Sequence, residues 1–123
     1  MNGIKYLLDT NTVIGLLNGY APAIALAKDC GLSLDEAAFS SITRIELLGY
    51  PDLTKQEESA IQAFLGTCHR FPVDKQVEDE AIRLRRTDPI KLPDAIICAT
   101  AIIHRLRLIT LDKDMQRKMN KIE

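Results

Sequence analysis

Four acidic side chains stand where strand-like runs end or where helices are expected to begin. Asp9 directly follows the apolar run Tyr6-Leu7-Leu8, and Asp112 comes shortly after the run RLIT, which ends at Thr110. Glu46 and Asp94 lie within the first two turns of expected helices. A buried carboxylate is costly unless something compensates its charge. The compensating group can be a helix N-terminus, a basic side chain or a metal ion.

Two of these acids have a simple local explanation. Asp94 follows Pro93 at the start of a helix, where the helix dipole favours an acid by about 0.3–1 kcal/mol. Thr43 and Glu46 have the spacing of a capping box, although the preceding strand places the cap more naturally at Ser41. Neither explanation covers Asp9.

The positions of the four acids also allow a shared explanation. Ligands of open parallel sheets bind outside the carboxyl ends of the strands, and Asp9 and Asp112 belong to that edge. Bare carboxylates about 4 Å apart repel each other by about 4 kcal/mol at an effective dielectric constant of 20. A divalent cation converts this repulsion into binding. A set of ligands made only of oxygens favours Mg²⁺ or Mn²⁺, an ion that commonly binds phosphate oxygens and activates water.

The elements that must position these acids alternate along the chain. Apolar runs predict strands, of which the one at residues 4–8 is expected to be buried. Capping and stop signals predict the helices between them, among them a capping box at Thr54–Glu57 and stops at Gly19 and Gly31. The strands are expected over residues 4–8, 37–40, 68–73 and 107–110, and the helices over 10–18, 21–30, 41–48, 54–65, 75–86, 92–106 and 113–119. This alternation predicts an α/β fold with a mostly parallel sheet and helices on both faces, formed by residues 1–123 as a single domain.

Composition excludes several classes of protein. The chain has 123 residues, 46% apolar and 27% charged, and no apolar run approaches the roughly 18–20 residues of a membrane span. Its first residues do not resemble a signal peptide, so a cytoplasmic location is expected. Cys30, Cys68 and Cys98 are widely spaced and form no CxxC pair, which argues against a disulfide framework or a zinc site.

The net charge of −1 gives no overall basic footprint for nucleic acid, but basic residues gather in two segments. They are either solvated helix faces or contacts for a phosphate backbone. The first segment holds Arg83, Arg85, Arg86 and Lys91, and the second holds Arg105, Arg107, Lys113, Arg117, Lys118 and Lys121.

Four segments together resemble the PIN-domain family, and within it the VapC-type toxins of bacterial toxin–antitoxin pairs. The segments are LLDTN at 7–11, SSITRIELLGY at 40–50, KLPDAIICATA at 91–101 and LITLDKDM at 108–115. The resemblance covers nearly the whole chain. It implies a compact α/β/α sandwich around a parallel sheet, and a metal-dependent endoribonuclease that hydrolyses RNA phosphodiester bonds by metal-activated water.

The resemblance also implies roles for individual residues. Asp9, Glu46 and Asp94 fall on the acids that hold one Mg²⁺ or Mn²⁺. Asp112 would complete the catalytic and metal site, although the family varies at this position, and Asp114 is a nearby substitute. The remaining supporting positions fall on Asn11 and Thr43. Thr10 and Asn11 are expected to orient the first carboxylate.

A protein partner is implied by the same resemblance. VapC-type proteins pair with a small antitoxin of the VapB type, whose C-terminal segment lies in a groove and blocks the acids. Here the groove is expected between the helices at 10–18, 21–30 and 41–48. Its candidate lining residues, which would otherwise be ordinary core, are Leu16, Leu17, Ile24, Leu47 and Leu48. A homodimer is also expected, since dimers are common in the family.

Two other functions fit parts of the pattern. A phosphatase of the haloacid dehalogenase type also places an aspartate after its first strand, but it needs a second acid where this chain has Asn11. A non-catalytic PIN-like module that binds RNA or protein would be expected to have lost one or more acids. Asp9, Glu46 and Asp94 are all present.

Overall fold

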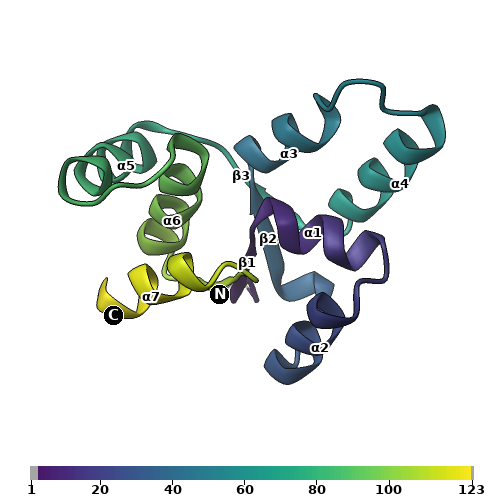
Figure 1. Ribbon diagram of the computed structural model, residues 1–123, viewed down its shortest axis with the longest axis horizontal. Helices are drawn as coiled ribbons and strands as arrows, with labels where there is room; N and C mark the ends of the chain where they lie inside the picture. The colour runs from purple at the N-terminus through teal and green to yellow at the C-terminus, as the bar shows by residue number, and fades with distance from the viewer. Residues whose placement is uncertain (1–2, 123) are drawn as a thin grey trace.

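A computed structural model describes residues 3–122 and places helices on both faces of a parallel sheet (Figure 1). The sheet has the strand order β3-β2-β1-β4, and every neighbouring pair is parallel. The four strands are β1 (Tyr6–Leu8), β2 (Ala37–Ser40), β3 (His69–Phe71) and β4 (Arg107–Ile109). This arrangement confirms the predicted α/β class.

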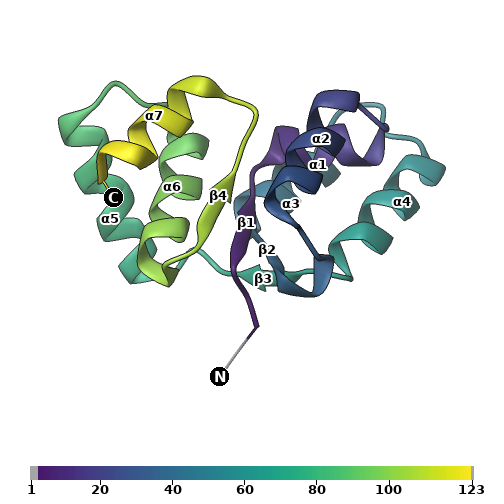
Figure 2. The same cartoon turned by 90° about the horizontal axis from the view of Figure 1, so that it is seen from below.

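Helices connect the strands and cover the sheet. The helices are α1 (Thr10–Leu17), α2 (Ala21–Cys30), α3 (Ser41–Leu48), α4 (Lys55–Leu65), α5 (Lys75–Thr87), α6 (Leu92–His104) and α7 (Lys113–Ile122), with a short 3₁₀ turn η1 (Leu34–Glu36) that the sequence analysis did not anticipate. Figure 2 shows α5, α6 and α7 on one side of the strands and α1 to α4 on the other. The result is the expected three-layer sandwich.

Adjacent residues of β1, an inner strand of the sheet, pack into the cores on opposite faces of the sheet. Leu7 and Leu8 are both fully buried, yet Leu7 belongs to the core under α5, α6 and α7, whereas Leu8 belongs to the core under α1, α3 and α4. Successive side chains of a strand point to opposite faces, so a strand covered on both faces is apolar without alternation. This explains why the run before Asp9 reads as continuously apolar.

Most element boundaries agree with the sequence analysis. The Thr54 capping box forms, with the Glu57 N–H donating to the Thr54 hydroxyl at 3.0 Å and the Thr54 N–H donating to Glu57 at 2.9 Å. Gly19 and Gly31, predicted as helix stops, have positive φ values of 68° and 66°. Such a conformation is open to glycine at little cost.

Several predicted boundaries were wrong. The N-cap of α3 is Ser40 rather than Ser41, because Ser40 keeps an extended backbone and its hydroxyl accepts the Ile42 N–H at 3.2 Å. Strand β3 ends at Phe71, since Pro72 has no N–H for the ladder. Helix α6 ends at His104 because Arg105 adopts a left-handed conformation with φ of 55°, and the final helix runs beyond the predicted residue 119.

The parallel arrangement of the strands determines where functional side chains from different elements come together. All four strands end at the same edge of the sheet, and α1 and α3 begin directly after β1 and β2. Helix α6 also begins near this edge, because Asp94 in its first turn is close enough to Asp9 for the charge of Asp9 to raise the pKa of Asp94. In residues 3–122 no helix is long and apolar enough to cross a membrane.

Candidate functional site

Asp9 lies at the end of β1 and its side chain is 4% exposed. One carboxylate oxygen, Oδ1, accepts the Thr12 N–H at 2.8 Å, so Asp9 caps the N-terminus of α1. The other oxygen, Oδ2, accepts the Thr110 hydroxyl at 2.5 Å. Both oxygens therefore have hydrogen-bond donors, and these hydrogen bonds offset part of the free-energy cost of burying the carboxylate.

Thr110 links Asp9 to Asp112. Its hydroxyl donates to Asp9 and accepts the Asp112 N–H at 3.0 Å. Strands β1 and β4 are neighbours with Leu8 opposite Ile109, so the residues that follow them, Asp9 and Thr110, come side by side. The register of one strand pair thus brings two predicted site residues to one place.

Glu46 reaches the site through Thr10. The Thr10 hydroxyl donates to Glu46 Oε1 at 2.7 Å. The Thr43 hydroxyl lies 3.0 Å from the same Thr10 oxygen. A hydroxyl has one proton, so Thr10 gives its proton to the carboxylate and accepts from Thr43. Thr43 is fully buried and supports Glu46 indirectly. Backbone or side-chain groups of Thr10 and Asn11 were expected to orient Asp9, whereas the Thr10 hydroxyl bonds to Glu46 and the hydrogen bonds of the Asp9 side chain come from Thr12 and Thr110.

Asp94 carries the clearest electrostatic signature. It stands in the first turn of α6 and is half-buried. Burial raises its pKa above the ordinary value, and the charges of Asp112, Asp9 and Glu46 raise it further, against an opposing effect of Lys91. Four carboxylates from four segments are therefore close enough to act on one another.

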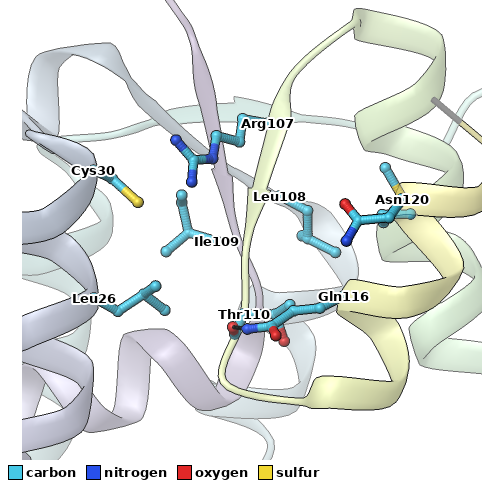
Figure 3. Close-up of a pocket in the computed structure, with 9 residues that line it drawn as sticks. Leu26, Cys30, Arg107, Leu108, Ile109, Thr110, Gln116 and Asn120 are labelled. Atoms are coloured by element: carbon cyan, nitrogen blue, oxygen red, sulfur yellow. Dashed lines mark hydrogen bonds between the residues drawn. The ribbon is translucent and has the colours of Figure 1, made fainter.

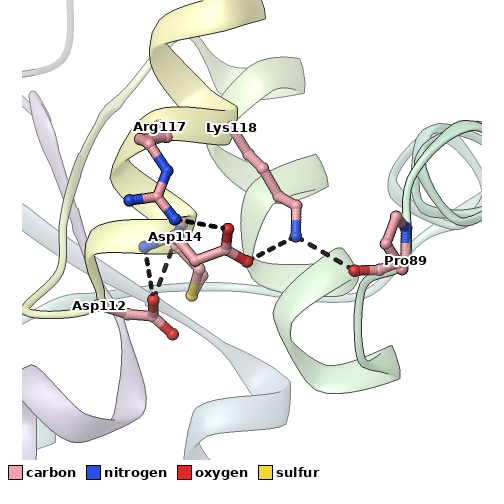
Figure 4. Close-up of polar contacts among 6 residues, drawn as sticks. Pro89, Asp112, Asp114, Arg117 and Lys118 are labelled. Atoms are coloured by element: carbon pink, nitrogen blue, oxygen red, sulfur yellow. Dashed lines mark hydrogen bonds and ion pairs between the residues drawn. The ribbon is translucent and has the colours of Figure 1, made fainter.

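Asp112 and Asp114 face different surroundings (Figure 4). Asp112 Oδ1 accepts the N–H groups of Asp114 and Met115, at 2.9 and 3.2 Å, so it caps α7. The Asp114 carboxylate instead pairs with Arg117 at 3.2 Å and Lys118 at 2.7 Å, and these contacts lower its pKa. Asp114 therefore has the environment of an ordinary acid in the first turn of a helix, and Asp112 is the better candidate for the site.

Asn11 is exposed on α1, in a hollow that it shares with Leu111, next to Asp112 in the chain. Among residues 3–122, no three His, Cys, Asp or Glu side chains form a ready-made set of metal ligands. The donor chemistry nevertheless fits a hard cation, since the neighbouring groups are oxygens and the repulsion on Asp94 is what such an ion relieves.

Thr12 and Thr110 contribute to the site and were missed by the sequence analysis. Thr12 donates its N–H to Asp9 and its hydroxyl to the Ile109 carbonyl at 3.0 Å, tying α1 to β4. The sequence does hold a signal for Thr110, because a polar residue directly after an apolar strand takes the position that Asp9 takes after β1. Recognising it required the strand order.

A first prediction concerns this buried hydroxyl. Thr110→Val should weaken binding of Mn²⁺ or Mg²⁺ by roughly 10-fold, the lower end of losses seen when a group that orients a metal ligand is removed. It should also lower the free energy of unfolding by about 1–3 kcal/mol, because one oxygen of the buried Asp9 loses its donor. Calorimetric titration and urea unfolding measure the two effects.

Thr100→Val is the matched control, since Thr100 is also fully buried but donates to the Ile96 carbonyl within α6 at 2.7 Å. It should leave cation affinity unchanged. Equal cation affinity in wild-type protein and Thr110→Val would contradict the role given to Thr110.

The basic residues are unequally available. Arg83 pairs with Glu80 on the same helix, and Lys118 pairs with Asp114 and donates to the Pro89 carbonyl at 3.1 Å. Lys91 stands at the N-terminus of α6, where its charge acts on Asp94. Lys91 is therefore the basic residue of the first segment whose charge favours the ionised form of Asp94.

A hollow of about 380 Å³ opens beside the acids and differs from the expected groove. Its walls come from α1, α3 and α4, with Leu17, Leu47 and Ile61 on the lining and Thr10 and Glu46 at its polar end. Helix α2, the third wall expected for the groove, does not line this hollow. Of the other expected lining residues, Leu16 and Leu48 pack against the core and Ile24 is half-buried on α2.

Comparisons with known proteins agree with this fold. The family model described as "PIN domain" matches residues 6–121. The chain is 32% identical to a chain of a toxin–antitoxin complex from Klebsiella pneumoniae, with a TM-score of 0.75 over 88% of this chain and 87% of that one. A comparison with curated proteins gives no match.

Two further solved structures show the same fold. FitAcB from Neisseria gonorrhoeae is 27% identical, with a TM-score of 0.69 over 89% of each chain. VapBC2 from Rickettsia felis, bound to a DNA fragment from its promoter, is 20% identical, with a TM-score of 0.74 over 93% of this chain and 92% of that one.

Proposed function

Because the chain belongs to the PIN-domain family, we propose that it is a VapC-type toxin that cleaves RNA with the help of Mg²⁺ or Mn²⁺. One arrangement carries the proposal: Thr110 links Asp9 to Asp112 and Thr10 holds Glu46 at the same edge, where burial and the charges of these three acids raise the pKa of Asp94. Such mutual repulsion is costly in a protein that never binds a cation there. The non-catalytic alternative offers no reason to retain it.

The residues of this chain would divide the work at the acidic edge. Asp9, Glu46 and Asp94 would hold the ion, with Asp112 completing the site. When bound, a divalent ion supplies polarisation of the phosphate and activation of a water. The Thr12 N–H and Thr110 hydroxyl hold Asp9 in a fixed orientation, and Thr10 does the same for Glu46. Lys91 is placed to attract the RNA backbone, a contact that adds affinity without sequence choice.

The proposal is tested by incubating the protein with total RNA and sequencing the new 5′ ends. Discrete cleavage sites are expected with Mg²⁺ or Mn²⁺, each with a 5′-phosphate, and they should vanish with a chelator and in Asp9→Asn. Cleavage that persists in the chelator, or that Asp9→Asn retains in full, would contradict a metal-dependent activity. The same experiment identifies which RNA is cut.

We also propose that an antitoxin regulates this activity from the hollow between α1, α3 and α4. The toxin–antitoxin complex from Klebsiella pneumoniae, which contains a chain similar to this one, supports a protein partner. The hollow is lined by the apolar residues Leu17, Leu47, Leu53 and Ile61 and by the acids Glu46 and Glu57. This combination suits an amphipathic segment with a basic side chain that reaches the acids. The chain would act as one domain, in the cytoplasm and as a homodimer.

Ile14→Glu should disrupt this docking. Ile14 is 39% exposed and lines the hollow, so a carboxylate there would be buried by the partner without a counter-charge. Affinity for the protein encoded by the adjoining reading frame should fall about 30-fold or more, a loss typical of a buried hot spot. Calorimetry of the purified pair measures it.

Ile82→Glu provides the control, because Ile82 is 48% exposed on α5, outside this hollow. It should bind the partner as wild-type does. If the two variants lose affinity equally, the partner does not dock in the hollow.

A further inference from the structure

The hollow that Asn11 shares with Leu111 has a volume of about 570 Å³, within the roughly 300–1,000 Å³ of small-molecule sites. One wall is a face of α1 that runs from Asn11 to Asn18, and the turn between α1 and α2 adds Tyr20. Asn11 lies two residues after Asp9, and Leu111 directly precedes Asp112. The hollow therefore adjoins the acidic edge.

Tyr20 is an exposed aromatic residue that is held against α1. Its N–H donates to the Gly15 carbonyl at 2.8 Å. A Cβ added at Gly15 would lie 3.5 Å from Cδ2 of the Tyr20 ring and 2.7 Å from Cβ of Ala23, so glycine at this position allows the ring and the start of α2 to approach α1 closely. The Tyr20 side chain is still 55% exposed. Its ring is therefore fixed in place and has surface left for a ligand.

Leu111 is positioned by the hydrogen bonds of the residue before it. The Gln116 carboxamide donates to the Thr110 carbonyl at 2.7 Å (Figure 3). The Thr110 hydroxyl accepts the Asp112 N–H at 3.0 Å, so a bond also joins the residues on either side of Leu111. The hollow therefore lies between two anchored segments.

The chemistry of this hollow suits an unpaired nucleobase. None of the described residues that line it is charged, whereas the hollow between α1, α3 and α4 contains Glu46 and Glu57, which repel the phosphates of RNA. Exposed aromatic rings stack on unpaired bases, and a carboxamide both donates to and accepts from a base edge. Asn11 and Asn18 are exposed on the face of α1 that lines the hollow.

We propose that this hollow binds one unpaired base of an RNA strand, stacked on Tyr20 with its edge toward Asn11 and Asn18, while a neighbouring phosphate lies at the acids. The inference rests on the proposed ribonuclease function and adds single-stranded RNA as the substrate class. Stacking tolerates any base, so Tyr20 would supply affinity, and the carboxamides would supply preference among bases.

Binding is measured by fluorescence anisotropy with 5′-labelled RNA strands of twelve A, twelve C or twelve U nucleotides. Ca²⁺ replaces Mg²⁺ to neutralise the acids, and a gel checks that the strands stay intact. Tyr20→Ala should weaken the tightest-binding strand about tenfold or more, since stacking of one base contributes this much. Tyr20→Phe keeps the ring and should bind within about twofold of wild-type.

Two controls separate base stacking from general attraction. Tyr50→Ala removes another exposed tyrosine, which is 69% exposed and lies outside this hollow, and should bind RNA as wild-type does. The duplex of the A and U strands should bind wild-type and Tyr20→Ala equally, because its bases are already stacked on one another. An unchanged affinity of Tyr20→Ala for all three single strands, or an equal loss in Tyr50→Ala, would overturn the proposal.

A spectroscopic reporter tests contact with the base directly. The chain has no tryptophan, so Tyr20→Trp introduces a single one at the hollow and Tyr50→Trp a single one outside it. RNA should quench the fluorescence of Tyr20→Trp with the midpoint found by anisotropy and leave that of Tyr50→Trp unchanged. Unchanged fluorescence of Tyr20→Trp at saturating RNA, or failure of every single strand to bind wild-type, would overturn the base site.

Cleavage assays distinguish this inference from the proposed ribonuclease activity. With an RNA that the protein cuts in Mg²⁺, Tyr20→Ala should raise KM about tenfold and keep kcat within about twofold, as expected for a residue that only binds substrate. An unchanged KM would overturn the base site and leave the ribonuclease proposal intact. RNA that binds through Tyr20 but is never cut with Mg²⁺ or Mn²⁺ would support the base site and contradict the ribonuclease proposal.

Discussion

Replacing Asp94 by asparagine should reduce metal-dependent RNA cleavage by more than about 100-fold, beyond the losses typical of groups that only orient a ligand. The same change should leave the ion-free protein as stable as wild-type or more stable. Burial and the nearby charges of Asp112, Asp9 and Glu46 raise the pKa of Asp94, so folding disfavours its ionised form. Asparagine keeps the shape and removes that charge. Cleavage rates and urea unfolding in chelator measure the two effects.

Asp114→Asn is the matched control for this experiment. It removes an acid of the neighbouring α7, where the carboxylate is held by Arg117 and Lys118 rather than by the site. Cleavage should stay within about twofold of wild-type, and stability should fall slightly, because exposed ion pairs contribute little. If Asp114→Asn loses as much activity as Asp94→Asn, the assignment of Asp112 over Asp114 is wrong.

The second large effect is stabilisation by the cation itself. A ligand at a hundredfold excess over its Kd stabilises the folded state by about 2.7 kcal/mol, which for a chain of 123 residues raises Tm by roughly 10 °C. Mn²⁺ or Mg²⁺ should produce this shift, because either ion relieves repulsion among the four carboxylates. Thermal unfolding with increasing ion concentration measures it.

Two controls distinguish binding of the ion at the acidic edge from general screening of surface charge, which could also raise Tm. NaCl at matched ionic strength should give a much smaller change, and Asp94→Asn should lose most of the shift produced by Mn²⁺. Equal stabilisation of wild-type and Asp94→Asn would mean that the ion acts elsewhere on the surface.

The order of elements could be predicted because local signals agreed with one another. The Thr54 capping box, the glycines at 19 and 31, and the strand at 37–40 all appear in the structure where the sequence indicates them. Continuous apolarity before Asp9 correctly indicated a strand covered on both faces. These features depend on neighbours in the chain, so the sequence alone carries them.

The finer geometry depends on contacts between distant segments. The hydroxyl of Thr110 meets Asp9 only because β4 lies beside β1 in one particular register. Thr10 serves Glu46 rather than Asp9 because α3 packs beside α1. The groove takes α4 as its third wall for the same kind of reason. No local pattern determines such partners, and the roles of single polar residues were therefore missed or misassigned.

The most direct test of the shared cation site is a crystal structure of the protein soaked in Mn²⁺, with the ion located by its anomalous signal. The account predicts one strong peak at the acidic edge, with oxygens of Asp9, Glu46 and Asp94 around it and Asp112 nearby. Peaks confined to other surfaces, with these carboxylates still directed apart at saturating ion, would contradict it.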